Sequence, residues 1–334
     1  MVNSIVISSR VRLARNFCEL PFPNKLCDFE SATSVAKAVF EILGEDFEYR
    51  RLKNMSTNQC LLLLEEHTIS KELIDNRDIS GYAKSPDGTI TIMINEEDHL
   101  REQCIMDGFC LNDCYKKINE IDNKILDKVD IAYSKNLGFL TACPTNVGTG
   151  MRASVMLFLP ALTLNGAMKQ LIEALDQKGF TVRGLYGESS ACDGYFYQIS
   201  NKFTLGLSEE EIISSVEKNV SYIVEMEEKA RKTLLSLNED VIIDMTLRAY
   251  GVLTNSYILS SKECIEMLSK LRFGVVLGII KLKNASIIDE LYITSQQAHL
   301  EDYFSLELNK KEEDIFRAKF VCESLENKFI KGVR

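Results

Sequence analysis

The sequence lacks the features that mark several large classes of protein. No apolar run approaches the roughly 20 residues of a membrane-spanning helix, and no N-terminal stretch is typical of a secretory signal. The ten cysteines form no C-x-x-C pair, so free thiols in a reducing compartment are expected. The net charge of −10 argues against nucleic acid or an anionic membrane as the main partner. We therefore expect a cytoplasmic protein.

Common catalytic and metal-binding motifs are also missing. The chain contains no P-loop, no H-R-D or D-F-G segment and no G-x-S-x-G elbow. Its three histidines, His67, His99 and His299, have no second ligand at metal spacing, so we expect no protein-bound metal. Residues 1–18 carry arginines and no acid, as a mitochondrial presequence does. Because residues 4–8 alternate like a strand, we favour a folded N-terminus.

What the sequence does contain is an unusual segment, LTACPTNVGTGMR, at residues 140–152. We interpret it as a strand end, a Pro/Gly/Asn loop and the first turn of a helix. Gly148 and Gly150 free the backbone, and Arg152 adds a positive charge beside the helix N-terminus, so the segment is suited to hold an anion. Cys143 stands at its start. The G-x-G-x-x-A pattern from Gly148 to Ala153 matches a dinucleotide fingerprint, but it lies in no clean βαβ unit and is rejected.

Two more groups of charged residues stand out. Arg10 and Arg12 are two residues apart, so on an extended backbone they point the same way, whereas the pattern leaves the direction of Arg15 open. A hairpin is predicted from strands 79–83 and 89–95 around Ser-Pro-Asp-Gly. The charged run EEDHLR, residues 96–101, follows it directly. A capped helix start would explain Asp98, but it explains the two preceding glutamates less well.

The remaining patterns predict the overall organisation. A capping box at Ser208 and Glu211 predicts the start of a long helix. Before it we expect helices at 31–43, 112–135, 152–160 and on to about 178, with strands at 60–64, 180–185 and 195–200. After Asn238 helices dominate, at 241–250, 261–271, 287–291 and 309–329. We therefore expect an N-terminal domain, residues 1–236, and a mostly helical C-terminal domain, residues 237–334.

The arginines and carboxylates together suggest phosphoryl transfer. Arginine stays charged and binds phosphate oxygens in pairs, which suits a polyphosphate. Carboxylates beside the arginines suggest a cationic second substrate. If that substrate is a guanidinium, whose pKa lies above about 12, a base must accept its proton.

Four segments in order, SSRVRLARN, INEEDHLREQ, CPTNVGTGMRAS and VRGLYGE, resemble the guanidino (phosphagen) kinase superfamily. The details IMINEEDH, TNVGTGMRASVMLFLPAL, YQISN and LGLSEEEI resemble its bacterial protein-arginine kinase branch. The similarity covers nearly the whole chain and is weaker after residue 236. It implies an α+β fold, in which an antiparallel sheet is flanked by helices, with a helical C-terminal domain for dimerisation or substrate docking.

The resemblance also implies roles for individual residues. Glu97 would be the base, Glu188 the second carboxylate on the acceptor guanidinium, and Cys143 would line the acceptor pocket, where a nearby cation favours its thiolate. Mg²⁺ would be carried on the nucleotide. ATP would be held by Arg10, Arg12, Arg101, Arg152, Arg183 and His67.

The reaction implied is transfer from ATP to arginine side chains of proteins. The branch further implies a role in protein quality control and the stress response, with a small zinc-containing activator and a Clp-type protease as partners, and a homodimer. Kinases of free guanidines carry an extra helical domain before SSRVR, whereas here this motif begins at Ser8, which favours a protein substrate.

Two departures from the family pattern keep alternatives open. The family has a further glutamate three residues after Glu188, where this chain has Ala191, although Asp193 could substitute for it. The phosphoarginine-sensing Arg-Asp pair of the family falls on Glu313-Asp314. The alternatives are therefore a kinase of a free small guanidine, such as arginine, and a catalytically weak adaptor that keeps the fold.

Overall fold

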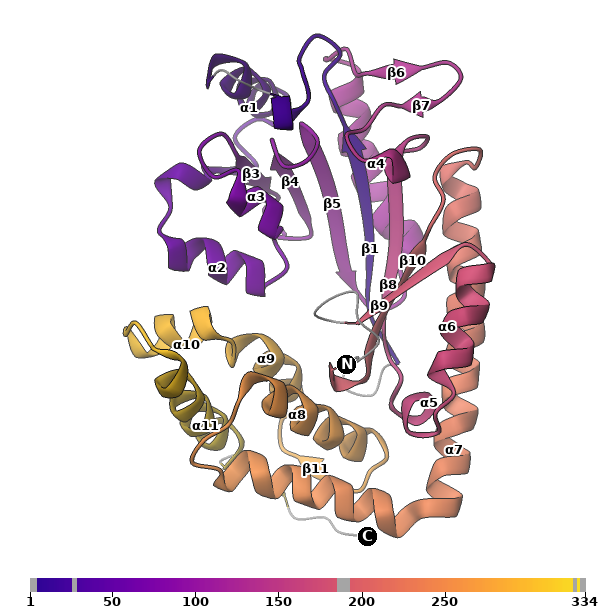
Figure 1. The fold of residues 1–334 in the computed structure, drawn as a ribbon, viewed down its shortest axis with the longest axis vertical. Coiled ribbons are helices and arrows are strands. Elements are labelled where there is room, and N and C mark those ends of the chain that lie inside the picture. The colour runs from indigo at the N-terminus through magenta and orange to yellow at the C-terminus, as the bar shows by residue number, and fades with distance from the viewer. Residues whose placement is uncertain (1–4, 26–28, 185–192, 327–328, 331–334) are drawn as a thin grey trace.

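The computed structural model describes residues 5–25, 29–184, 193–326 and 329–330. An eight-stranded sheet forms the centre of the first two thirds of the chain, and every neighbouring pair of strands in it is antiparallel (Figure 1). The strand order is β2 (Glu48–Arg51), β3 (Gly81–Lys84), β4 (Ile90–Ile94), β5 (Leu100–Asp107), β1 (Val6–Arg15), β8 (Met151–Phe158), β10 (Phe196–Asn201) and β9 (Phe180–Gly184). The antiparallel sheet predicted from the sequence is therefore confirmed.

One face of the sheet is buried under helices. Its apolar side chains, such as Val11, Ile92 and Val155, join a single core with the inward stripes of the covering helices. Alternate residues of the same strands point to the opposite face. Over β3 and β4 this face is covered, since Tyr82 and Met93 pack against Cys60 and Leu73. We call the remaining part, which lines a cleft, the open face. The covering helices are α1 (Phe29–Leu43), α4 (Leu111–Leu126), α6 (Met168–Gln177) and the first half of α7 (Glu209–Asn255).

The segment after Gly150 corrects the predicted helix at 152–160. It forms β8, the strand between β1 and β10. Ala153, Val155 and Leu157 are fully buried, and these alternate positions follow the two-residue period of a strand. Pairing on both sides satisfies its backbone groups, and this outweighs the helical propensity of its alanine and methionines. Pro160 begins the short helix α5 (Pro160–Leu164), the position where proline is tolerated in a helix.

Other predictions were wrong at particular elements. The apolar run at 60–64 belongs to a helix, α2 (Thr57–Glu65), which begins with a capping box between Ser56 and Gln59. The residues after Asp98 form β5, which excludes the alternative of a capped helix start there. The helix predicted for 112–135 ends at Leu126. Helix α3 (Lys71–Asp75) and helix α10 (Gln297–Phe304) were not predicted.

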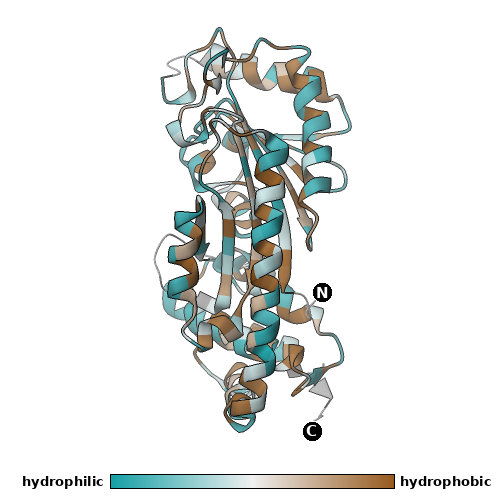
Figure 2. Cartoon of the chain, turned by 90° about the vertical axis from the view of Figure 1, so that its right-hand side faces the viewer, coloured by the Kyte–Doolittle hydropathy of each residue, from teal (hydrophilic) through white to brown (hydrophobic). Residues whose placement is uncertain are grey.

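Helix α7 links the two halves of the chain. Its predicted capping box is confirmed, since the Ser208 side chain accepts a hydrogen bond from Glu211 N and the Glu211 side chain accepts one from Ser208 N. The helix runs for 47 residues, with a break in backbone geometry at Asn238. In Figure 1 its first half runs down the right-hand side of the molecule and its second half crosses the bottom. Figure 2 views that side face on and shows hydrophilic and hydrophobic residues interspersed along the first half. The predicted boundary at 236/237 lies inside this helix, close to the break.

The C-terminal region is helical, as predicted, and the apolar cluster around Leu268, Ile288 and Val321 also includes Phe158 and Phe196 of the N-terminal region. The two regions also touch where α10 meets α2. There Glu65 accepts hydrogen bonds from Ala298 N and His299 N, at 2.9 and 3.2 Å. Within the described ranges, no helix has the length and apolar character needed to cross a membrane. The other C-terminal helices are α8 (Ser261–Val276), α9 (Ser286–Thr294) and α11 (Lys310–Glu326).

Candidate active site

The register of the sheet gathers the predicted arginines on its open face. Arg12 of β1 lies directly opposite Arg152 of β8. In the next row Arg10 faces Ser154, whose hydroxyl accepts a hydrogen bond from Gln198 Nε2 at 3.1 Å, and Gln198 faces Arg183 of β9. Residues paired across strands point to the same face, so four strands contribute to one cationic surface. Arg101 of β5, opposite Ala14, joins it from the other side of β1.

The cationic surface is short of hydrogen-bond acceptors. The Nε atoms of Arg10 and Arg12 are buried, and neither has a hydrogen-bond partner among the described residues. Burial and the neighbouring arginines lower the pKa of Arg10 to about 9, and the same causes lower the pKa of Arg12 well below its ordinary value. Buried donors that repel one another are stabilised by a polyanion. This arrangement therefore fits the phosphates of a nucleotide.

Two arginines of this surface are already oriented by neighbouring side chains. Arg152 donates from Nε and Nη2 to Ser200 Oγ, at 3.2 and 2.9 Å. Arg101 forms an ion pair with Glu96, a buried carboxylate that also accepts a hydrogen bond from Ser70. Fixing the guanidinium planes before a ligand arrives reduces the ordering cost of binding.

A tight turn between β4 and β5 presents Glu97. Asn95 has a positive φ of 58°, and its N–H donates to His99 O at 2.9 Å. Glu97 is exposed at the tip of the turn, whereas Glu96 and Asp98 on either side are buried. Partial burial, then Asp98 and Glu96, raise the pKa of Glu97. A solvent-facing carboxylate with a raised pKa is a candidate proton acceptor.

Asp98 ties this turn to the loop that carries Cys143. Its Oδ1 accepts hydrogen bonds from Ala142 N and from Asn16 Nδ2, each at 2.6 Å. Asn16 in turn donates to Leu140 O at 3.1 Å. The carboxylate turn and the cysteine loop are thus held at a fixed separation. Sequence reasoning missed Asn16, because nothing in its spacing distinguishes it from an ordinary residue at the end of a strand.

The loop itself depends on its glycines. Gly148 has φ +120° and Gly150 φ +67°, and a Cβ at Gly148 would lie 2.3 Å from Thr204 O. Thr204 Oγ1 contacts the carbonyls of Thr145 and Val147, at 3.0 and 2.7 Å. Cys143 Sγ lies 3.0 Å from the hydroxyl of Thr145. Glycine is therefore required here because the backbone of another segment packs closely against it. The helix N-terminus expected after the loop is absent, because the chain continues as strand β8.

A cleft of about 560 Å³ joins these groups. Four arginines line it together with Glu97 and Cys143. Two exposed acids of α3, Glu72 and Asp75, line it as well and were not predicted from the sequence. The predicted site residues in its lining are Arg12, Arg101, Arg152, Arg183, Glu97 and Cys143.

The remaining predicted site residues are placed differently. Arg10 does not line this cleft but shares a sheet face with residues that do. His67 follows α2 with a positive φ of 59°, and desolvation and the charge of Arg10 lower its pKa. Glu188 and Ala191 lie outside the described residues, and so does the side chain of Asp193.

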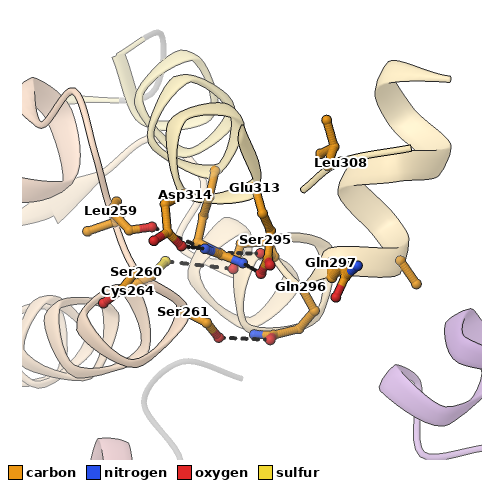
Figure 3. Close-up of polar contacts among 12 residues, drawn as sticks. Leu259, Ser260, Ser261, Cys264, Ser295, Gln296, Gln297, Leu308, Glu313 and Asp314 are labelled. Carbon is orange, nitrogen blue, oxygen red and sulfur yellow. Dashed lines mark hydrogen bonds and ion pairs between the residues drawn. The ribbon is translucent and has the colours of Figure 1, made fainter. Parts of the chain in front are cut away.

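The carboxylates of Glu313 and Asp314 are engaged inside the C-terminal region. Both form ion pairs with the buried guanidinium of Arg317. Arg317 also donates to Ser295 O at 2.8 Å and to Leu259 O at 3.1 Å. Figure 3 shows the two acids and these carbonyl-bearing residues gathered at one point between helices. The acidic pair therefore holds an arginine of the same chain.

Comparison with known proteins finds two families along the chain. The family described as "ATP:guanido phosphotransferase, C-terminal catalytic domain" matches residues 30–230, and "Protein-arginine kinase McsB C-terminal domain" matches residues 239–331. The protein-arginine kinase of Clostridium acetobutylicum is 44% identical over 328 residues, which cover 97% of this chain and 96% of that protein. The protein-arginine kinase of Bacillus licheniformis is 39% identical over 329 residues, 97% and 90% of the two chains.

Solved structures match about two thirds of the chain. Lombricine kinase superposes with a TM-score of 0.59 and 27% identity, covering 67% of this chain and 66% of that chain. The duplicated taurocyamine kinase of Schistosoma mansoni, with bound components of a transition state analog, gives a TM-score of 0.60 and 28% identity. That match covers 67% of this chain and 33% of the other. The guanidino kinase fold expected from the sequence is thereby confirmed.

Proposed function

Because this chain belongs to the protein-arginine kinases, within the ATP:guanido phosphotransferase family, we propose a division of labour within its cleft. The enzyme uses ATP, and its substrates are arginine side chains of proteins. In the proposal, the open face of the sheet holds the phosphates, and the turn and loop at its edge hold the acceptor. The observation that carries it is one cleft lined by four arginines, Glu97 and Cys143.

The nucleotide half of the site is the arginine surface. We assign the phosphates to Arg10, Arg12, Arg101, Arg152 and Arg183, with His67 as a further contact. The buried, unpaired Nε atoms of Arg10 and Arg12 support this assignment, since a phosphate oxygen satisfies such donors. Mg²⁺ carried on the nucleotide would neutralise part of the phosphate charge. When the phosphates and the acceptor guanidinium are both held in place, the rate of phosphoryl transfer depends on their alignment and on stabilisation of the developing charge.

The acceptor half is acidic. Glu97 would orient the guanidinium and accept its proton, Glu188 would be the second carboxylate on it, and Cys143 would line the pocket. Glu72 and Asp75 add negative charge to the same cleft, which favours a cationic acceptor. In this proposal the attacking nitrogen would lie between the carboxylates and the arginine-bound phosphates.

The proposed role of Glu97 as proton acceptor predicts how kcat/KM falls as the pH is lowered. Glu97 must be ionised to accept a proton, and its pKa is raised by partial burial and by its acidic neighbours. The rate should therefore fall, as pH decreases, at a higher pH than an ordinary glutamate would give. The measurement is kcat/KM for a protein acceptor between pH 5 and 9, at saturating Mg·ATP and constant ionic strength. An acid side at or below the ordinary value of 4.5 would contradict the assignment.

The biological setting is proposed from the family resemblance. We propose a cytoplasmic homodimer that marks proteins for a Clp-type protease during stress, with a small zinc-containing activator. Residues 237–334 would form the domain for dimerisation and substrate docking, a division supported by the break at Asn238. At Glu313-Asp314 we propose a structural role in place of phosphoarginine sensing, because both carboxylates hold Arg317.

One experiment tests the proposed activity against its alternatives. The protein is incubated with Mg·ATP and either casein or free arginine, and acid-labile phosphoarginine is measured by mass spectrometry. Transfer to casein is expected. Transfer to free arginine alone would identify a kinase of small guanidines, and no transfer to either would identify the adaptor suggested by Ala191.

A further inference from the structure

A buried ionic cluster lies beneath the cysteine loop, on the face of the sheet opposite the arginine surface. It consists of Arg15 from β1, Asp122 from α4 and Glu102 from β5, whose exposed fractions are 2%, 2% and 0%. Arg15 alternates with Arg10 and Arg12 along β1 and therefore points away from them. Three ionisable groups in a core are costly unless they are tightly paired, so this cluster requires an explanation.

Arg15 binds Asp122 and the loop at the same time. Its Nε and Nη2 donate to the two oxygens of Asp122, at 3.0 and 2.7 Å. Its Nη1 donates to Thr149 O at 3.0 Å. The guanidinium carbon lies 3.6 Å from the centre of the Phe139 ring, and Phe139 N donates to Gly148 O at 2.8 Å. One planar group thus supports the loop from two directions.

The loop closes directly onto this guanidinium. A Cβ at Gly150 would come within 2.6 Å of Arg15 Nη1, so the backbone lies against the charged group. From here the chain leads back to Cys143 and forward to Arg152. Arg15 therefore holds the point where the loop that carries Cys143 joins β8, the strand that carries Arg152.

Glu102 completes the cluster. Neither of its oxygens has a hydrogen-bond partner among the described residues. Burial and then the charge of Asp122 raise its pKa well above the ordinary value, although Arg15 acts in the opposite direction. With one guanidinium for two buried carboxyls, the protonated form of Glu102 is favoured and Arg15 pairs with Asp122.

Building on the proposed function, we propose that Arg15 is a positioning residue for phosphoryl transfer. Asp122, which lies in the same buried cluster as Glu102, fixes the plane of the Arg15 guanidinium. The guanidinium in turn fixes the segment from Gly148 to Gly150. Through this segment it sets the position of Cys143 relative to the phosphates. The arginine contacts the protein loop from beneath and does not touch either substrate.

The test variant is Arg15→Lys. Lysine keeps the charge but cannot bind both oxygens of Asp122, reach Thr149 O and stack on Phe139 together. We expect kcat/KM for the protein acceptor to fall about 10- to 100-fold, because a loop displaced by an ångström loses alignment, while KM for ATP changes by less than about twofold. Alkylation of Cys143 by iodoacetamide, followed by site-resolved mass spectrometry, should accelerate because the loop is less confined.

Arg231→Lys is the matched control. Arg231 is also buried, donating to Glu227 Oε1 at 2.7 Å and to Phe158 O at 3.1 Å. It lies in α7, outside the proposed active site. This variant should lower Tm as Arg15→Lys does, yet leave Cys143 alkylation and both KM values unchanged. If Arg15→Lys behaved like this control, Arg15 would have a structural role only, and the positioning proposal would be wrong.

Two milder variants keep the test decisive if Arg15→Lys fails to fold. Asp122→Asn removes one charge-assisted contact to Arg15 and should accelerate Cys143 alkylation. Glu102→Gln mimics the protonated acid and should leave alkylation unchanged. Unaltered alkylation in Asp122→Asn, or acceleration in Glu102→Gln, would overturn the proposal. The alkylation result does not depend on turnover, so it remains interpretable even if casein receives no phosphate and the proposed function fails.

Stability gives an independent check on the proton at Glu102. The folded protein retains this proton, whereas the unfolded chain loses it as pH rises through about 4.5. The free energy of unfolding should therefore fall with rising pH above that value, and Glu102→Gln should remove this component. Equal pH slopes in wild type and variant would contradict a retained proton. The groups facing the cluster are Arg15, Asp122, Tyr115 and, further away on α7, Glu209 and Glu210.

Discussion

Replacing Glu97 by glutamine is expected to lower kcat roughly 10²- to 10⁴-fold, the usual contribution of a general base, while ATP still binds. Glutamine keeps the shape of the side chain and its place in the turn, but it cannot accept a proton from the guanidinium. The arginine surface is unchanged, so nucleotide affinity should be preserved. The measurements are phosphoarginine formation in casein and ATP binding by calorimetry.

A suitable control for Glu97→Gln is Glu120→Gln, at an exposed position of α4, which should leave both measurements unchanged. A Glu97→Gln enzyme with a near-normal rate would show that another group takes the proton. The sequence makes the same prediction for Glu188→Gln, although that residue lies outside the described part of the structure. If only one of the two variants lost phosphoryl transfer, its residue would be the base, and the other glutamate would only orient the guanidinium.

Replacing Arg12 by methionine is expected to stabilise the nucleotide-free protein while removing its response to ATP. Arg12 is surrounded by other arginines, its Nε has no partner among the described residues, and Glu96 compensates only in part. Exchanging a poorly compensated charge for an apolar side chain of similar length should add about 1–4 kcal/mol to the free energy of unfolding. ATP affinity should fall roughly 10- to 100-fold, the value of lost charge-assisted hydrogen bonds.

Both effects of Arg12→Met can be measured in one thermal-unfolding series with and without Mg·ATP. Wild type should show a large increase in Tm on adding the nucleotide, and the variant should start higher and shift little. Arg50→Met provides the control, because Arg50 of β2 is exposed and forms an ion pair with Glu48 of the same strand. A variant less stable than wild type that still responds fully to ATP would place Arg12 outside the phosphate site.

Much of the site could be predicted because its residues lie close together in short segments. The two-residue spacing of Arg10 and Arg12 requires only an extended backbone, and the turn at Ser-Pro-Asp-Gly specifies its hairpin locally. The capping box at Ser208 and Glu211 is likewise a local contact. These features depend on interactions within a few residues, which composition and spacing encode directly.

The features that were missed depend on contacts between distant segments. Residues 151–158 form a strand because β1 and β10 lie on either side of it, and no local pattern reports those neighbours. Glu72 and Asp75 of α3 look like ordinary exposed acids until the fold places them in the cleft. The role of Asn16 depends on Asp98, which is 82 residues away.

The sequence by itself determined the residue types on which the proposed chemistry depends: arginines for phosphates, carboxylates for a guanidinium, and a glycine-rich loop that brings backbone close to other groups. The tertiary structure decided how these parts are aligned. Arg15 shows the difference, since its motif places it beside Arg10 and Arg12 but the pleat turns it to the opposite face. There it meets Asp122, 107 residues further along the chain. Side-chain direction follows the local backbone, whereas the partner that it meets is set by packing between distant segments.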